Sequence, residues 1–216
     1  NLTFHHNLFI DNGGRDPKTD GNMQVINDVI YNFRLGIYGN GSGTEVCDFV
    51  GNYHINGPGT HANSLNTGIN VDNTDGTYFV SGNLWDNNLN GILDGNPLVS
   101  GSGSFAPNLS ATRFCDPLVP VTEDSAQLAY HKVVSSAGCS LSRDPLDAEL
   151  ITQVKSLGTQ GPGPDLYMKH LNPYPNPNPW TGSAIPAWTV TGGTAPVDTD
   201  GDGMPDDWEK ANGSNV

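Results

Sequence analysis

An asparagine or aspartate standing directly before a pair of mostly apolar residues recurs four times in the first part of this chain. The repeats begin at Asn7, Asp28, Asn52 and Asn83, so they are 21, 24 and 31 residues apart. Repeats of this length with loops of varying size are typical of solenoids, in which equivalent residues of successive turns stack on one another. The pattern therefore predicts an all-β, parallel β-helix in which these polar side chains hydrogen-bond along a ladder.

The apolar residues around these repeats predict the strands of the β-helix, whose coils should occupy residues 1–115. Parallel strands are expected near Leu2–Ile10, Gln24–Tyr31, Glu45–Tyr53 and Thr77–Trp85. A Greek-key sandwich would show similar strand spacing. However, the loops between these segments lengthen along the chain and no tight hairpin signal joins them, so the parallel helix is favoured.

The charge balance limits the classes of partner. The 216 residues carry a net charge of −14 and only nine Lys and Arg residues, so nucleic-acid binding, which needs a basic surface, is disfavoured. An acidic polysaccharide would also be repelled unless a local basic patch or a bridging divalent cation received it. Arg15, Lys18 and Arg34 form such a patch, since no other Lys or Arg precedes Arg113. No stretch is long and apolar enough to predict a membrane span.

After the coils, residues 116–157 show the periodicity of helices. Apolar residues on one face predict a helix from about Asp124 to Ala137, with Thr122 as its cap and Gly138 as its stop. Asp144 and the proline that follows it are expected to open a second helix. Both helices should pack along the β-helix or cap it.

Three further features concern the organisation of the chain. Residues 158–196 are rich in Pro, Gly and Asn and should form an irregular wrap or a linker. Cys115 and Cys139 flank the first helix and could form a disulfide, whereas Cys47 lies within a strand and should be a buried thiol. Because Asn1 already opens a strand, we expect the chain to be the C-terminal part of a larger β-helix, with the missing coils as its partner.

Residues 197–216 contain a second strong pattern, an acidic loop that starts at Asp198. Carboxylates stand at positions 1, 3, 5, 9 and 12 and a glycine at position 6, which is the spacing that wraps oxygen ligands around Ca²⁺. The backbone carbonyl of position 7 would complete the set. The loop is therefore expected to hold a structural calcium ion that ties down the tail. The expected ligands are Asp198, Asp200, Asp202, Met204, Asp206 and Glu209.

Arg15 follows a short apolar strand that begins with His5-His6-Asn7. The turn Asn12-Gly13-Gly14 ends this strand. Pro17 fixes its own φ and keeps Asp16 extended, so the Arg15 side chain leaves a stiffened loop. An arginine two residues before a proline, just after a strand that opens with His-His-Asn, resembles the catalytic segment of the pectate lyase family.

The resemblance continues along most of the chain. Val25–Asn32 and Val50–Thr60 resemble the next two coils of that family, Ala126–Val154 resembles the helical tail of many bacterial members, and Asp198–Glu209 resembles their acidic appendage. Membership would imply a right-handed parallel β-helix, a secreted enzyme and a requirement for Ca²⁺.

The resemblance also implies a reaction, the β-elimination of polygalacturonate or a related uronate polysaccharide. Arg15 would remove the proton from C5 of a uronate unit and the C4–O glycosidic bond would then break. Lys18 would hold a substrate carboxylate, and Arg34 belongs to the same basic surface. Asp20 departs from the pattern, because many relatives carry a second arginine at that position. The carboxylates that bind the substrate-bridging Ca²⁺ in the family come from a segment N-terminal to this one.

Two other functions are compatible with the same residues. A β-helix could bind polysaccharide or serve as a surface scaffold without catalysis, and the substitution at Asp20 favours that alternative. A glycoside hydrolase would need two facing carboxylates, for which Asp11, Asp28 and Asp48 are the candidates. His5 and His6 are neighbours in a strand, so their side chains should face opposite ways and take structural roles rather than share a site.

Overall fold

The computed structural model describes seven stretches of the chain, which belong to two compact units, Asn1–Pro186 and Ala187–Val216. None of the helices in these stretches is long and apolar enough to cross a membrane. The described residues are 2–39, 44–60, 68–71, 75–98, 109–114, 120–163 and 194–214.

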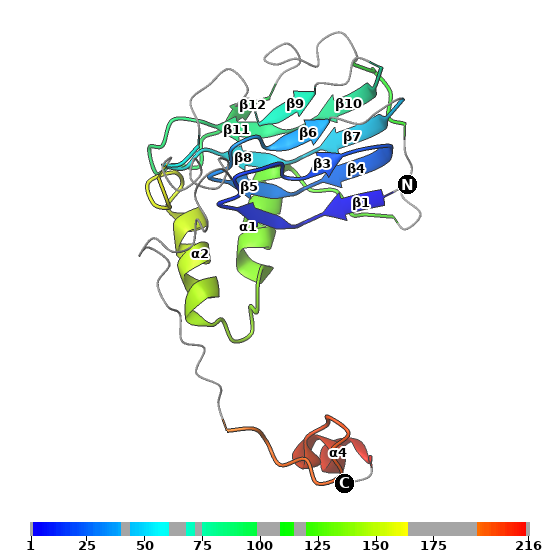
Figure 1. Cartoon of the computed structure of the whole chain (residues 1–216), viewed down its shortest axis with the longest axis vertical. Coiled ribbons are helices and arrows are strands. Elements are labelled where there is room, and N and C mark those ends of the chain that lie inside the picture. Colours follow the sequence, from blue (N-terminus) through cyan, green and yellow to red (C-terminus); the bar gives the residue numbers. More distant parts are fainter. Residues whose placement is uncertain are drawn as a thin grey trace, which may run out of the picture. The chain divides into compact units, whose positions relative to one another are not determined.

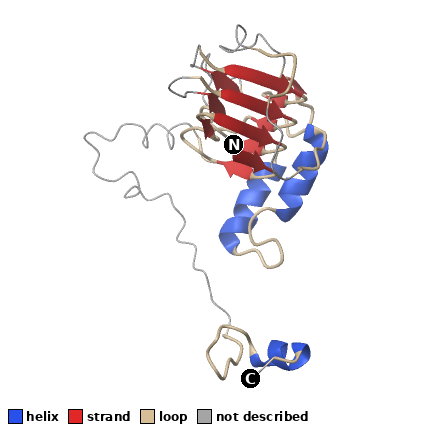
Figure 2. Cartoon of the chain, turned by 90° about the vertical axis from the view of Figure 1, so that its right-hand side faces the viewer, coloured by secondary structure: helices blue, strands red, loops and turns tan. Residues whose placement is uncertain are grey.

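The first unit consists of short strands that return to the same three sheets in turn (Figures 1 and 2). Sheet A contains β1 (Leu2–His5), β4 (Asn22–Ile26), β7 (Val46–Val50) and β10 (Thr77–Ser81). Sheet B contains β2 (Leu8–Ile10), β5 (Val29–Tyr31), β8 (Tyr53–Ile55), β11 (Leu84–Asp86) and β12 (Asn96–Pro97). Sheet C contains β3 (Lys18–Thr19), β6 (Ile37–Gly39) and β9 (Ile69–Val71).

Neighbouring strands within each sheet come from successive turns of the chain. All of them pair in parallel except β12, which is antiparallel to β11. The parallel stacking expected from the repeats is therefore confirmed for the four predicted segments. This strand order is compatible with a β-helix of the pectate lyase type, and its right-handed sense stays a prediction.

Each of the four predicted strands is in fact two strands joined at a corner. A residue with left-handed φ stands directly before each of the four repeat residues, Asn7, Asp28, Asn52 and Asn83. Asn27 (φ 57°) and Gly51 (φ 61°) are two examples. Asn and Gly adopt this conformation at low cost, and it turns the chain from sheet A to sheet B. The apolar pattern continues through the corner, which is why the sequence shows one long strand instead of two.

The interior of the coils holds a continuous apolar core. Alternate residues of each strand point inward, so Val25 and Phe49 of sheet A meet Ile30 of sheet B and Ile37 of sheet C inside the solenoid. All four side chains are fully buried. The three sheets therefore enclose one core. This core fixes the position of sheet C and of the turns that join the sheets.

The ladder predicted from the repeats is present. The backbone N–H and side-chain Nδ2 of Asn7 both donate to Oδ1 of Asp28, at 2.7 and 3.0 Å. The backbone N–H of Asp28 donates to Oδ1 of Asn52, and Asn52 donates in the same two ways to Oδ1 of Asn83. These four residues are called the amide ladder below.

Helices α1 (Ala126–Ser136) and α2 (Pro145–Lys155) cover the outer face of sheet B, as Figure 2 shows. Tyr130 and Val133 of α1, with Val154 of α2, pack against Tyr31 and Tyr53 of the sheet. Burial on both faces explains why β2 and β5 of sheet B carry apolar or aromatic residues at every position. Both helices therefore lie along the coils.

Two local predictions about this region fail. Thr122 does not cap α1, because the helix begins later and the Ser125 side chain accepts the hydrogen bond from the N–H of Leu128. Cys139 is a free, exposed thiol, so the disulfide expected for it is absent, and Cys115 lies outside the described residues. The expected stop at Gly138 (φ 68°) and the buried thiol of Cys47 are confirmed.

Candidate active site and calcium loop

The turn that carries Arg15 is fixed to the next coil through its backbone. The N–H of Asp16 donates to the carbonyl of Gly36 at 2.7 Å, and the N–H of Tyr38 donates to the carbonyl of Pro17 at 3.0 Å. The N–H of Arg34 donates to the carbonyl of Asn12 at 3.2 Å. Three such bonds within six residues hold the turn, which includes a cis Asp16–Pro17 peptide, in one conformation at the edge of sheet C.

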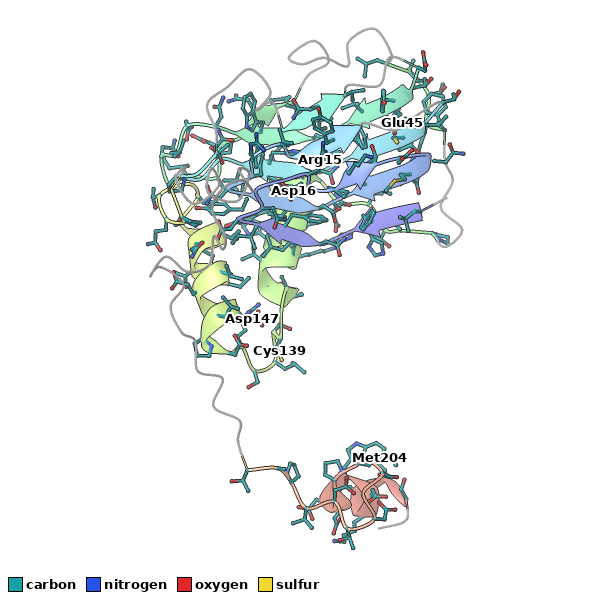
Figure 3. The ribbon with its side chains drawn as sticks, in the orientation of Figure 1. Arg15, Asp16, Glu45, Cys139, Asp147 and Met204 are labelled. Carbon is teal, nitrogen blue, oxygen red and sulfur yellow. The ribbon has the colours of Figure 1, made fainter. Side chains whose placement is uncertain are left out.

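The Arg15 side chain is exposed and leans on an aromatic ring. Its guanidinium carbon lies 5.0 Å from the centroid of the Tyr38 ring, which is a cation–π distance. Among the described residues, no carboxylate forms an ion pair with it. A surface arginine could also pair with a nearby carboxylate, here Asp16, Asp11 or Asp20. The structure shows none of these ion pairs, and the guanidinium of Arg15 is exposed (Figure 3).

Asp16 lies beside Arg15 in the sequence but points into the protein. Its side chain is fully buried, Asn12 Nδ2 donates to its Oδ1 at 2.6 Å, and its Oδ2 has no partner. Burial raises the pKa of this carboxyl to about 7, against a partial opposing effect of the Asn12 bond. A buried and readily protonated carboxyl does not neutralise the neighbouring guanidinium.

Lys18, Arg34 and Tyr38 complete this surface. Lys18 is exposed on β3 and lies directly opposite Tyr38 of β6 in the parallel register. Arg34 is half-buried in the turn that precedes β6, stacked on the turn of Arg15. Sequence reasoning missed Tyr38, which the register of the coils pairs with Lys18 and whose ring contacts Arg15. Asp20 is exposed and adds a negative charge at the position where a second arginine was implied.

The three carboxylates considered for a hydrolase do not form a pair. Asp28 lies in the amide ladder, and Asp48 accepts from Gln24 and lies 3.4 Å from Nε of Arg113. Asp11 accepts from Asn32, and burial raises its pKa to about 6. Each serves a separate structural contact, so the geometry gives no support to a two-carboxylate mechanism.

The expectation that the side chains of His5 and His6 face opposite ways is wrong. His5 Nδ1 and His6 Nδ1 lie 3.2 Å apart, and His6 Nε2 lies 3.0 Å from Oδ2 of Asp124. The reason is the corner described above, since β1 ends at His5 and His6 has a left-handed φ of 55°. The alternation of a strand therefore does not apply to this pair.

The acidic loop of the second unit gathers its carboxylates around one point. One carboxylate oxygen from each of Asp198, Asp200 and Asp202 lies within 4.8 Å of the other two. Glu209, on α4 (Asp206–Asn212), is fully buried and neither of its carboxylate oxygens has a partner. Burial and the surrounding aspartates raise its pKa. A buried carboxylate without partners beside three others is the donor set that suits a hard cation such as Ca²⁺.

Asp206 has a different part in this loop from the one expected. Its two carboxylate oxygens accept from the N–H and the hydroxyl of Thr199, at 2.7 and 2.8 Å, and Lys210 lies 3.6 Å away. It closes the loop onto the start of α4. Whether it also reaches a cation, and whether the Met204 carbonyl does, stays a prediction.

Comparison with known proteins finds relatives along nearly the whole length of this chain. A probable pectate lyase C from Neosartorya fischeri is 33% identical over 217 residues, which cover 99% of this chain and 47% of that protein. Probable pectate lyase C from Aspergillus terreus is 34% identical with the same coverage, and that from Emericella nidulans is 34% identical over 96% of the chain. No family model matches the chain.

The first unit is a solenoid of parallel strands with the Arg15 turn at the edge of sheet C. Over nearly its whole length the chain is homologous to proteins named probable pectate lyase C, which supports its assignment to the pectate lyase family. The chain spans about half the length of these relatives.

Proposed function

We propose that this chain forms the C-terminal coils of a secreted, calcium-dependent lyase that cleaves polygalacturonate or a related uronate polymer by β-elimination. The observation that carries the proposal is Arg15. It is held at the edge of sheet C by a fixed turn, it rests on Tyr38, and no described carboxylate neutralises it. The relatives are about twice as long, which supports a whole enzyme larger than these coils.

In this proposal the Arg15 guanidine acts as the base. It takes the proton from C5 of the uronate, the C5–H electron pair becomes the C4–C5 double bond, and the C4–O bond breaks. The departing oxygen then takes a proton from water, so the products are one unsaturated and one ordinary chain end. A free guanidinium has a pKa above 12, so the reaction should be favoured at alkaline pH. Lys18 and Arg34 would bind substrate carboxylates on the same surface.

The proposed enzyme would use two separate calcium ions, one at the substrate and one in the loop of the second unit. Bound between enzyme and substrate, the first ion would withdraw charge from the uronate carboxylate and acidify C5–H. The described residues around Arg15 offer only one buried carboxylate, Asp16, and Asn12 occupies one of its oxygens, so the ligands of that ion are expected elsewhere in the whole enzyme. The loop of the second unit, with Glu209 and the three aspartates, would hold a structural Ca²⁺.

The test is the variant Arg15→Lys in the whole enzyme. We expect kcat to fall at least about 100-fold with KM changed little, because an ammonium on a flexible stem cannot reproduce the position of the planar guanidinium. Arg143→Lys is the matched control. Arg143 binds carbonyls at the end of α1, away from sheet C, and its variant should retain activity.

Circular dichroism and thermal unfolding should show that Arg15→Lys is folded, since Arg15 lies outside the core. Retention of more than about a third of the activity by Arg15→Lys would refute its role as base and favour the scaffold alternative.

A further inference from the structure

The loop that follows β11 repeats the pattern of the calcium loop in the second unit. Its acidic or amide residues stand at positions 1, 3, 5 and 9, with a glycine at position 6. The order Asp, Asx, Asx, Gly at positions 1, 3, 5 and 6 is the start of a calcium-binding loop. Positions 1, 3, 5, 6, 7 and 9 are Asp86, Asn88, Asn90, Gly91, Ile92 and Asp94 here, and Asp198, Asp200, Asp202, Gly203, Met204 and Asp206 in the tail. Residues 86–94 are called the Asp86 loop below.

The two loops also share their backbone path. The N–H of Asn90 donates to Oδ1 of Asn88 at 3.1 Å and the N–H of Ile92 donates to Oδ1 of Asn90 at 2.7 Å. At the equivalent places in the tail, Asp202 donates to Asp200 and Met204 donates to Asp202. The glycine at position 6 has a left-handed φ in both loops, 77° and 93°. The side-chain oxygens of positions 3 and 5 are therefore turned in the same way.

An independent observation points to a ligand. Asp86 is 2% exposed, and its Oδ2 is buried without any hydrogen-bond partner. Asp94 stands at position 9 of the same loop, so its carboxylate is the second one that the loop offers. A buried, unsatisfied carboxylate oxygen is costly, and a cation between the two carboxylates would remove that cost.

The remaining donors are already gathered. Asn88 and Asn90 each donate a side-chain amide to Asp94, both at 2.9 Å, so two side chains of the loop already converge on one carboxylate. A bound cation would replace these two amide N–H groups as the partner of the Asp94 carboxylate. The side chains of Asn88 and Asn90 would then turn their amide oxygens toward the cation. The loop is also anchored at its middle, where the N–H of Gly91 donates to the carbonyl of Leu157 after α2, and just past its end, where the N–H of Gly95 donates to the Tyr53 hydroxyl.

We propose that the Asp86 loop is a second calcium site, with Asp86, Asn88, Asn90, Asp94 and the Ile92 carbonyl as its protein ligands. Position 12 is Pro97, so the bidentate glutamate of the tail loop is missing, and only two carboxylates balance the ion. Affinity rises with ligand charge, so this site should be weaker than the tail site, with a Kd on the order of 0.1–1 mM. Bound calcium would fasten the last coil to the end of α2. The inference does not depend on lyase activity.

The test counts Ca²⁺ bound to the full chain by isothermal titration calorimetry. We expect two ions, one of them weak. Asp86→Asn should abolish the weak one, and Asp198→Asn should abolish the strong one. The gain-of-charge variant Asn90→Asp should tighten the weak site about 10-fold, because it adds a carboxylate at a ligand position.

Asn87→Asp is the matched control for Asn90→Asp, since it adds the same charge to the same exposed loop at position 2, which is not a ligand. It should tighten the site at most about 2-fold through general electrostatic attraction. One ion per chain, or equal effects of Asn87→Asp and Asn90→Asp, would overturn the proposal. The Asn90→Asp comparison decides the question even if Asp86→Asn fails to fold.

Discussion

The amide ladder contains one residue that does not match its neighbours, and replacing it should stabilise the protein. Asn52 Nδ2 donates to the carbonyl of Val25, and Asn83 Nδ2 donates to the carbonyl of Phe49. The strand register places Phe4 at the equivalent position for Asp28. Asp28 has an oxygen, Oδ2, where the asparagines have a donor, and that oxygen has no partner.

The magnitude follows from the pKa of this carboxyl. Burial raises the pKa of Asp28 from 3.8 to about 7, although the two bonds from Asn7 act in the opposite direction. At a pH between these two pKa values, the Asp28 carboxyl is deprotonated in the unfolded chain and protonated in the folded protein. The free energy of unfolding therefore falls as the pH rises from about 4 to about 7. A difference of about three in pKa corresponds to about 4 kcal/mol at pH 8.

Asp28→Asn removes this loss and supplies a donor for the Phe4 carbonyl. We expect the variant to be more stable than the natural chain by up to about 4 kcal/mol at pH 8 and by no more than about 1 kcal/mol at pH 4. Urea unfolding at both pH values, at one fixed Ca²⁺ concentration, measures the difference. The other carboxyls with raised pKa values, which are Asp11, Asp16, Asp86 and Glu209, are common to both proteins, so their contributions cancel.

Asn83→Asp is the mirror-image control. It keeps the oxygen that accepts from Asn52 and replaces the donor to Phe49 by an oxygen, so it should lose stability at pH 8 and lose less at pH 4. If the stability difference between Asp28→Asn and the natural chain does not change with pH, the assignment of a protonated carboxyl to the ladder is wrong.

Two further predictions concern the tail and the free cysteine. Excess EGTA should make the segment after residue 194 the first to be cut by a protease, because Glu209 and the three aspartates would repel one another without a cation; an unchanged digestion pattern would argue against a structural ion there. Cys139→Ser should leave the thermal midpoint within about 2 °C of the natural chain, since an exposed free thiol contributes little, whereas a drop of more than about 5 °C would reveal a disulfide.

The repeat spacing made the solenoid predictable, but not its third sheet. Asn7, Asp28, Asn52 and Asn83 mark equivalent corners, so one alignment gave both the ladder and the parallel pairing. The strands of sheet C are two or three residues long, which is too short for a periodic signal. The corner conformation at His6 was equally hidden, because left-handed φ is uncommon for any residue other than glycine and no glycine marks this corner.

Within the candidate sites, residue types were predictable and partners were not. The arginine turn and the acidic loop could be found from local motifs, as Arg15 and Asp198 show. The contact of Arg15 with Tyr38 depends on the register between coils, and the burial of Glu209 depends on how α4 folds back on its loop. The Asp86 loop was overlooked because asparagines replace two of the aspartates and no glutamate ends it.

The mass of the products released from polygalacturonate by the whole enzyme tests the central claim most directly. β-Elimination adds no water across the cleaved bond, so each cut should give one fragment that is lighter by one water than the corresponding hydrolysis product and absorbs in the ultraviolet. These unsaturated fragments should disappear with Arg15→Lys and persist with Arg143→Lys. Fragments of full hydrolysis mass, or unsaturated fragments formed undiminished by Arg15→Lys, would contradict the account.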